Sequence, residues 1–374
     1  MSGDVALVWG PELLSYRLSE DHPMQPLRLE LTVAEIERRG LDRGTVRLGP
    51  RPATDSELER CHTAAYVELV RALSQPATRD AAARVLGGQH GFGSSDNPIA
   101  DGMHESAAFI CGSSLVAASA VHRGEVAHAF SCAGGHHHAA RDRASGFCVY
   151  NDVAVAAAWL RDQGHRVAVV DVDVHHGDGT QWLHYDDPAV LTVSLHESGR
   201  YLFPGTGFID ETGVGKGRGT SANVPLPPFT WDEPWLAAFE AVVPPLLEAF
   251  QPTVLLTQDG CDTHLLDPLA DLRCSTRLWP YLGRRLHALA HELCGGRWVA
   301  LGGGGYAIRE VVPRAWTLLF AAMVERPELA ADLVDPEPFP PEAVAQERIW
   351  DHLERERAAL EQALGRSLTL RRAG

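Results

Sequence analysis

The chain has 374 residues, with 49 Asp and Glu against 33 Lys and Arg, which gives a formal net charge of −16 at pH 7. So acidic a chain is a poor partner for nucleic acid or for an anionic membrane surface, and we expect neither. Hydrophobic residues make up 45% and charged residues 22% of the sequence. These fractions exclude a disordered chain and are typical of a globular protein.

The cysteines and the apolar runs indicate the compartment. Seven cysteines occur without a C-x-x-C pair, which is typical of reduced thiols and argues against a disulfide framework. The sequence has no basic segment followed by a long apolar one at its start, and no run of about 18 apolar residues. We therefore expect a soluble, cytoplasmic protein.

The order of the predicted elements indicates one α/β domain. Ala-rich stretches alternate with short β-branched runs, and no repeat or low-complexity linker divides the chain. The apolar runs VAVV and TVLL lack in/out alternation, which predicts a mainly parallel sheet covered on both faces, in three layers. The segment 330–374 is predicted to be a C-terminal helical extension packed on this domain. The stretches are 107–121, 151–164, 166–174, 189–195, 253–257, 297–301 and, in the extension, 342–364.

Polar side chains follow two of these runs and point to a metal site. Asp171, Asp173 and His175 alternate with valines and share one face if the strand persists to His175. Buried carboxylates at a strand end are costly unless a cation compensates for them. Asp262, after the TVLL run, could complete an Asp, His, Asp set that suits Zn²⁺, Fe²⁺ or Mn²⁺. The alternative is a hydrogen-bonded network without a metal.

Two other aspartates follow the TVLL run. Asp259 and Asp267 are both predicted to be turn formers. Asp267 also precedes a proline, as turn chemistry prefers.

Three consecutive histidines, His136 to His138, lie between two glycine-containing turns. Free imidazoles carry protons near neutral pH, and an acidic neighbour such as Asp171 or Asp178 would orient them and raise their basicity. A His-rich metal clasp is the alternative, although adjacent side chains in an extended segment diverge. We predict proton transfer as the role of this run.

The run GGGGY has two interpretations. Gly302, Gly304 and Ala307, with Glu325 about 20 residues on, imitate a dinucleotide-binding fingerprint after a strand. The other interpretation is a permissive turn that presents the Tyr306 hydroxyl to a cleft, where it could stabilise an oxyanion. We favour the second, because the run lies late in the chain and no strand obviously follows it.

Taken in order, seven motifs resemble those of the histone deacetylase superfamily, especially its bacterial acetoin-utilisation-type members: GGHHHA, SGFCVYND, DVDVHHGDG, VSLHE, YLFPGTG, QDGCD and GGGGY. The resemblance begins at HPMQPLRLELT (22–32), continues through HTAAYVELV (62–70) and DNP (96–98), and reaches Tyr306. It implies a single arginase/deacetylase-like domain. It also implies a metal-dependent amidohydrolase that removes acetyl groups from the lysine side chains of proteins or peptides and releases acetate.

The resemblance assigns roles to individual residues. It implies metal ligands, usually for zinc, at Asp173, His175 and Asp262. His138 is expected to take a proton from water, and one histidine of the pair to protonate the leaving amine, while Tyr306 and the metal share the oxyanion. The catalytic residues implied are His137, His138, Tyr306, and the carboxylates paired with the two histidines in turn, Asp171 and Asp178.

The resemblance also implies a narrow channel for acetyl-lysine. Phe147 and Phe203 match its walls, and Gly146 lies beside them. Asp96 matches a rim acid that grips the backbone amides of the substrate, and Arg28 matches an arginine deep in the channel near the acetate exit. A structural potassium ion (K⁺) is implied at Ser194 and Leu195, together with Asp171, Asp173 and His175.

Four positions depart from what relatives show. His136 supplies a third imidazole before the pair, and Asp259 stands where relatives often have His or Leu. Gly177 and Gly260 replace carboxylates that the two-metal arginases require, so a single catalytic metal is expected.

Other functions remain open at this stage. Acetylpolyamines or other small acyl amines are alternative substrates that the acidic charge suits, and acetylated acetyl-CoA synthetase is a candidate protein partner. A catalytically silent acyl-lysine binder is the alternative outside the enzymes.

Overall fold

The computed structural model describes residues 4–372, and one sheet of eight strands forms its centre. Its strand order is β2-β1-β3-β8-β7-β4-β5-β6, and every pairing is parallel. The prediction of a mainly parallel α/β sheet is therefore confirmed. The strands are β1 Val5–Val8, β2 Val46–Leu48, β3 His128–Ser131, β4 Val167–Asp171, β5 Val190–Glu197, β6 Ser221–Leu226, β7 Val254–Gln258 and β8 Trp298–Leu301.

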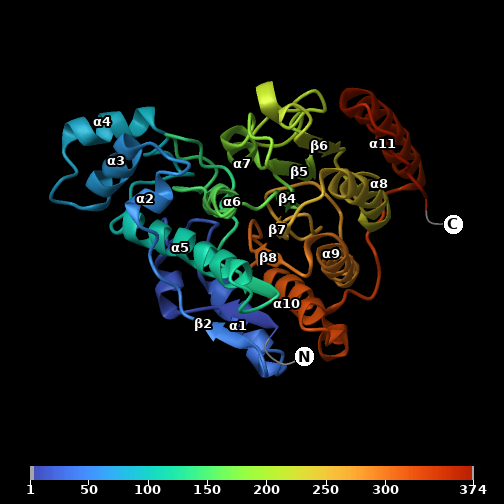
Figure 1. The fold of residues 1–374 in the computed structure, drawn as a ribbon, viewed down its shortest axis with the longest axis horizontal. Helices are drawn as coiled ribbons and strands as arrows, with labels where there is room; N and C mark the ends of the chain where they lie inside the picture. Colours follow the sequence, from blue (N-terminus) through green and yellow to red (C-terminus); the bar gives the residue numbers. More distant parts are fainter. Residues whose placement is uncertain (1–3, 373–374) are drawn as a thin grey trace.

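Helices cover both faces of this sheet, which gives the three predicted layers (Figure 1). Helices α5 and α6 pack on one face, α8 and α9 pack on the other, and α10 packs on α9 and α1. The helices are α1 Leu27–Arg38, α2 Asp55–Leu58, α3 Ala64–Ser74, α4 Ala81–Gln89, α5 Met103–His122, α6 Asp152–Asp162, α7 Asp178–Leu183, α8 Asp232–Phe250, α9 Leu278–Cys294, α10 Val312–Met323 and α11 Ala343–Leu364.

Strand β4 shows why both faces are covered. Val167 and Val169 belong to the apolar core under α5 and α6, whereas Ala168 and Val170 belong to the core on the other face. All four side chains are buried. Each apolar side chain removed from water contributes about 25 cal/mol per Å², so a strand that is apolar on both sides is stable only between two helical layers.

Two helical groups lie at the periphery (Figure 1). Helices α2 to α4 project at the upper left, and α11 lies at the right beside α8. The predicted helix at 342–364 is present as Ala343–Leu364, and it packs on α8 and β6. Its Trp350 ring lies 6.4 Å from Trp231, between ring centroids. Among the described residues, no helix is both long and apolar enough to cross a membrane.

Candidate active site and metal centre

Four adjacent strands, β3, β8, β7 and β4, bring the predicted chemistry to one edge of the sheet. Parallel strands present their carboxyl ends at the same edge, and each of these four is followed there by one of the predicted motifs. The histidine run follows β3, the Gly-Tyr turn follows β8, the QDGCD motif spans the end of β7, and the DVDVH motif spans the end of β4. Residues far apart in the sequence therefore meet at one place.

Asp173, His175 and Asp262 form a buried cluster in which the donor atoms all lie within 4.8 Å of one another. The His175 Nδ1 atom lies 3.1 Å from Asp173 Oδ1 and 3.1 Å from Asp262 Oδ2. The strand does not persist to His175, the condition for a shared face, because it ends at Asp171. Backbone amides cap the carboxylates instead: Asp173 Oδ1 accepts from the His175 amide, and Asp262 Oδ1 accepts from the Val174 amide.

Two glycines leave room for these carboxylates. A Cβ atom at Gly260 would lie 2.0 Å from Asp173 Oδ2, and one at Gly304 would lie 1.9 Å from Asp262 Oδ2. Asp173 Oδ2 also accepts hydrogen bonds of 2.7 Å from the Gly304 amide and from Gln258 Nε2. Sequence reasoning passed over Gln258, although it stands directly before the DGCD residues that it supports.

The two carboxylates of this cluster favour a positive charge between them. Burial lowers the pKa of His175, but hydrogen bonds to Asp173 and Asp262 outweigh it and raise the pKa to about 10. Burial and the charge of Asp173 raise the pKa of Asp262 to about 7. Two buried carboxylates and one imidazole nitrogen that converge in this way fit a divalent cation with Zn²⁺, Fe²⁺ or Mn²⁺ chemistry.

His137 and His138 form a hydrogen-bonded pair beside this cluster. His137 Nδ1 lies 2.7 Å from Asp171 Oδ2, and His138 Nδ1 lies 2.7 Å from Asp178 Oδ1. The two Nε2 atoms are 3.0 Å apart. Because His138 donates to Asp178 through Nδ1, its Nε2 is the acceptor, and His137 Nε2 donates to it. Each histidine therefore has the carboxylate partner that the resemblance implies.

The two histidines differ in charge. Burial lowers the pKa of His137, but Asp171 and Asp173 outweigh it and raise the pKa to about 9. Burial and the neighbouring His137 lower the pKa of His138 to about 4. At neutral pH, His137 is an imidazolium and His138 is neutral. The pair thus holds one proton donor and one proton acceptor side by side, as general acid–base chemistry requires.

His136 lies apart from the pair. Its ring packs on Tyr16 at 4.7 Å between centroids, and its amide donates to Asp152 at 2.7 Å. Burial and the Arg28 charge lower the pKa of His136 to about 3. The alternative of a His-rich metal clasp is wrong, because the three rings do not form a cluster of donors among the described residues.

Tyr306 ends the Gly-rich turn that follows β8. Its amide donates to Asp267 Oδ2 at 2.7 Å, and its ring meets Phe147 edge-on at 5.6 Å. Burial and the charges of Asp262 and Asp173 raise the pKa of the Tyr306 phenol well above its ordinary value. The hydroxyl therefore keeps its proton and can serve as a hydrogen-bond donor.

The contacts of the Gly-rich turn at 302–305 argue against the dinucleotide-binding interpretation. The Gly304 amide is used by Asp173, and the Gly303 carbonyl accepts from Arg28 at 2.7 Å. Among the described residues, no strand follows β8, so the turn does not open a βαβ unit. The Gly-rich segment supports the metal cluster.

Phe147 and Phe203 flank the cluster from two sides. Phe203 lies 5.0 Å from His138 and is 44% exposed, whereas Phe147 contacts Tyr306. Gly146 and Phe147 both have positive φ, of 48° and 68°, a strained conformation for a phenylalanine that is typical of functional sites. A Cβ atom at Gly146 would lie 2.3 Å from His138 Cδ2, so only glycine fits there.

Arg28 lies in the interior of the protein, whereas Asp96 lies at its surface. Arg28 is buried under the Gly-rich turn and donates to the Gly303 and Gly305 carbonyls. Asp96 is exposed. His22 lies between Asp96 and Phe147: its Nε2 atom is 3.2 Å from the Asp96 backbone carbonyl oxygen, and its ring centroid is 4.5 Å from that of Phe147. This placement fits the implied roles of a deep arginine and a rim carboxylate. Sequence reasoning did not single out His22.

The expected potassium residues are only partly together. Ser194 stands beside Asp171 in the β4–β5 ladder, and both line a buried cavity of about 10 Å³. A cavity of this size holds about one water-sized particle. Leu195 is buried outside that lining. A potassium ion here stays a prediction.

The prediction that Asp259 is a turn former is wrong, because the residue follows β7 without forming a turn. The residue is fully buried and accepts a 2.6 Å hydrogen bond from the Thr257 hydroxyl. Burial raises the pKa of this carboxyl well above its ordinary value. Asp267 does form a turn, since it accepts from the Leu269 amide, but its other oxygen holds Tyr306.

Asn151 and Asp152 position the histidine run through hydrogen bonds to its backbone. The sequence did not lead us to predict either role. Asn151 caps α6 and donates to the His137 and Ala139 carbonyls at 2.9 and 3.1 Å. Asp152 accepts from the Gly135 and His136 amides. The signal was available, because the pair ends the SGFCVYND motif just before a predicted helix, where Asn is a favoured cap.

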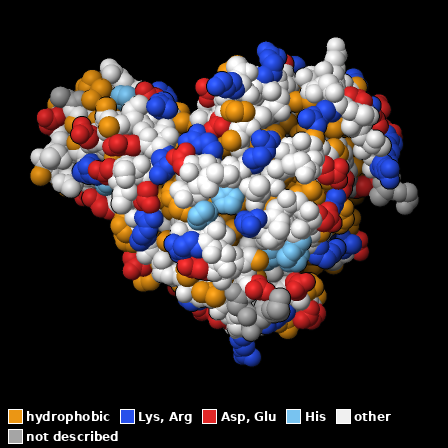
Figure 2. All heavy atoms as spheres, in the orientation of Figure 1, with side chains coloured by type: hydrophobic (Ala, Val, Ile, Leu, Met, Phe, Trp, Pro, Cys, Tyr) orange, Lys and Arg blue, Asp and Glu red, His pale blue; other side chains and the backbone are white. Residues whose placement is uncertain are grey.

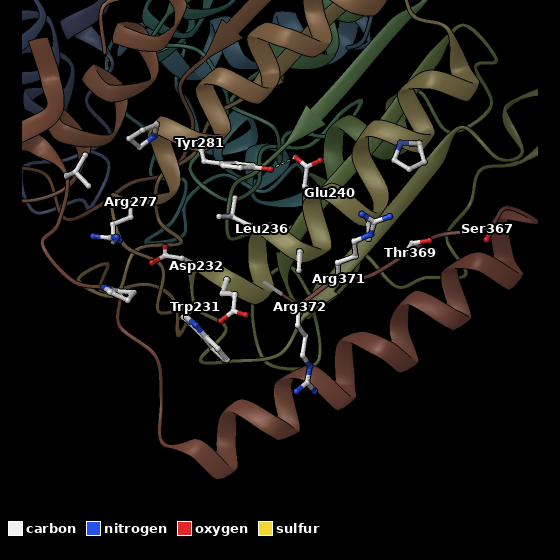
Figure 3. Close-up of a pocket in the computed structure, with 17 residues that line it drawn as sticks. Trp231, Asp232, Leu236, Glu240, Arg277, Tyr281, Ser367, Thr369, Arg371 and Arg372 are labelled. Atoms are coloured by element: carbon white, nitrogen blue, oxygen red, sulfur yellow. Dashed lines mark hydrogen bonds between the residues drawn. The ribbon is translucent and has the colours of Figure 1, made fainter. Parts of the chain in front are cut away.

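A large cavity lies away from this site. It measures about 1020 Å³ and opens between α8, α9 and the C-terminal segment. Figure 3 shows its polar groups, among them Tyr281, whose hydroxyl donates to Glu240 at 3.0 Å. None of the predicted site residues lines it.

Comparison with known proteins agrees with this geometry. The pattern of the histone deacetylase domain matches residues 22–323. The chain is 41% identical to the acetoin utilization protein AcuC of Bacillus subtilis (strain 168) over 325 residues, 86% of this chain and 82% of that protein. It is 38% identical to the AcuC protein of Staphylococcus aureus (strain MSSA476) over 327 residues, 87% and 83% of the two chains. The chain therefore belongs to the histone deacetylase family and is a deacetylase.

Proposed function

We propose that this deacetylase acts on the acetylated lysine side chains of proteins or peptides, and that it depends on a divalent metal, Zn²⁺ first and Fe²⁺ or Mn²⁺ as alternatives. One observation carries the proposal. The His137–His138 pair, with one protonated and one neutral ring, lies beside the Asp173, His175 and Asp262 cluster.

The metal would be held by Asp173, His175 and Asp262, and it would supply Lewis-acid polarisation of the amide carbonyl. His138 is neutral, and its Nε2 atom, which accepts from His137 Nε2 in this structure, takes the proton of the attacking water once that hydrogen bond is released. His137 Nε2 carries a proton at neutral pH and passes one to the leaving amine. Such positioned acid–base pairs are worth roughly 10²–10⁴ in rate.

Tyr306 and the aromatic walls complete the reaction site. The Tyr306 hydroxyl donates a hydrogen bond to the carbonyl oxygen as negative charge develops on it. Phe147 and Phe203 present apolar faces that suit the neutral methylene chain of an acylated lysine better than a free ammonium. The deacetylated product carries such an ammonium, so the same walls favour its release.

The competing substrate class is a small acyl amine such as an acetylpolyamine. Asp96 distinguishes the two, because an exposed rim carboxylate can accept hydrogen bonds from the backbone amides of a peptide, which acetylputrescine lacks. We expect kcat/KM for an acetyl-lysine peptide to exceed that for acetylputrescine at least tenfold.

The test compares both substrates on the wild-type protein and on Asp96→Asn. The variant should raise KM for the peptide more than KM for acetylputrescine, because the peptide loses the acceptor of its backbone amides whereas the acetylputrescine ammonium loses only a charge attraction. His352→Gln, a half-buried histidine of α11, is a matched control that should change neither. Faster turnover of acetylputrescine than of the peptide would overturn the proposed substrate.

A further inference from the structure

A second cluster of imidazoles lies at the opposite edge of the sheet from the active site. His128 opens β3, so it stands at the amino end of a strand whose carboxyl end leads to the histidine pair. His287 and His291 lie on α9, four residues apart and therefore on the same face of the helix. One of the two gatherings of histidine side chains on the face in Figure 2 lies over α9.

The three rings are close enough to share one ion. Their centroids are 4.8 Å apart for His128 and His287, 5.1 Å for His128 and His291, and 4.6 Å for His287 and His291. One donor nitrogen from each ring lies within 4.8 Å of the other two. The Nε2 atoms of His128 and His291 are 3.2 Å apart. Two imidazole nitrogens bound tetrahedrally to one zinc ion lie about 3.3 Å apart.

The His128 ring is only 2% exposed, and it turns its Nε2 atom toward His291. In the part of the chain that the structure describes, the Nδ1 atom of His128 has no hydrogen-bond partner. A neutral imidazole binds metals through one nitrogen and keeps a proton on the other, so Nε2 is the nitrogen of His128 that faces the proposed ion.

A cavity of about 420 Å³ opens onto the three rings. Asp4 and Glu325 contribute carboxylates to its lining, and Arg43 and Arg326 contribute guanidinium groups, so these charges balance. Burial of the rings increases from His291, which is exposed, through His287 to His128. A metal held by the rings would thus have a fourth position open to water or to an external ligand.

We propose that His128, His287 and His291 form a second transition-metal site, which takes Zn²⁺ through three imidazole nitrogens. Three imidazoles with one open position are an established donor set for this ion. The ion would connect α9 to the amino end of β3. This site is independent of the proposed catalytic function.

Metal stoichiometry tests the proposal. Tag-free protein is stripped of metal, equilibrated by dialysis against micromolar Zn²⁺, and its metal content is measured by mass spectrometry. We expect two zinc ions per chain for the wild type and for the His352→Gln control, and one for His287→Gln/His291→Gln. Asp262→Asn, which disables the catalytic cluster, should retain one ion, at the imidazole site.

Cobalt gives an independent readout, since Co²⁺ in a tetrahedral site absorbs visible light. Asp262→Asn loaded with Co²⁺ should show such a band, and the band should disappear when His291→Gln is added. His287 and His291 are not fully buried. The His287→Gln/His291→Gln variant and the variant that adds His291→Gln to Asp262→Asn should therefore keep the far-ultraviolet circular dichroism of the wild type. Equal zinc content in the wild type and in the folded His287→Gln/His291→Gln variant, or no zinc in folded Asp262→Asn, would overturn the proposal.

Discussion

Replacing Gly304 by alanine perturbs the ligand cluster without removing any donor atom. The added Cβ would lie 1.9 Å from Asp262 Oδ2 and 2.9 Å from Asp173 Oδ2, whereas real Cβ contacts below 3.0 Å essentially do not occur. The backbone cannot yield easily, because the Gly304 amide donates to Asp173 and its carbonyl accepts from the Cys261 amide. The Asp262 carboxylate must therefore move by about 1 Å, a misplacement that can cost about 100-fold in rate.

We expect Gly304→Ala to lower kcat/KM on an acetyl-lysine peptide by about 100-fold or more and to weaken zinc binding at the catalytic cluster. The free energy of unfolding should fall by about 1–3 kcal/mol, the usual cost of overpacking. Activity, zinc titration and chemical denaturation measure the three quantities. Gly88→Ala is the matched control, because nothing lies within 4 Å of its added Cβ in α4, and alanine favours a helix.

Wild-type turnover and zinc affinity in Gly304→Ala would refute the reasoning. Such a result would mean that the carboxylates of Asp262 and Asp173 do not hold the catalytic ion in the arrangement described. Equal losses in Gly304→Ala and Gly88→Ala would also refute it, since the effect would then not come from the contact with Asp262.

Three further predictions concern the histidine pair, Tyr306 and Asp259. Activity needs neutral His138, with a pKa of about 4, and protonated His137, with a pKa of about 9. The profile of kcat/KM against pH should therefore rise at or below the first value and fall at or below the second, since a bound cation lowers both; a profile still rising at pH 10 would contradict this. Tyr306→Phe should lower kcat by roughly 10²–10³ with little change in melting temperature, and unchanged kcat would remove the tyrosine from the mechanism. Asp259→Asn should keep wild-type activity, because burial raises the pKa of this carboxyl and so favours its neutral form, which asparagine resembles, and a large loss would show that it acts as a charged group.

Four strands could be predicted because they form continuous apolar or β-branched runs. Strands β4, β5, β7 and β8 lie within the predicted segments at 166–174, 189–195, 253–257 and 297–301 or extend past them by one or two residues. Strands β1, β2 and β3 were missed, because three or four residues alone give too little periodicity to separate a strand from a loop. Strand β6 was missed because its sequence SANVPL contains serine, asparagine and proline, which are typical of turns.

The ligand cluster could be predicted from short-range pattern, whereas its supports could not. Asp173 and His175 lie two residues apart, and Asp262 follows a recognisable strand. Gln258 and Asp173 are 85 residues apart, and their contact depends on the adjacency of β4 and β7. His128 and His291 are 163 residues apart, so the imidazole site was equally invisible before the fold was known.

Metal dependence is the central claim, and one measurement addresses it most directly. Metal-stripped protein is assayed on a fluorogenic acetyl-lysine peptide, and Zn²⁺, Fe²⁺ or Mn²⁺ is then added singly. We predict no activity in the stripped protein, recovery with at least one ion, and no recovery in Asp262→Asn. Full activity of the stripped protein, or failure of every ion to restore turnover in protein that binds it, would contradict the account.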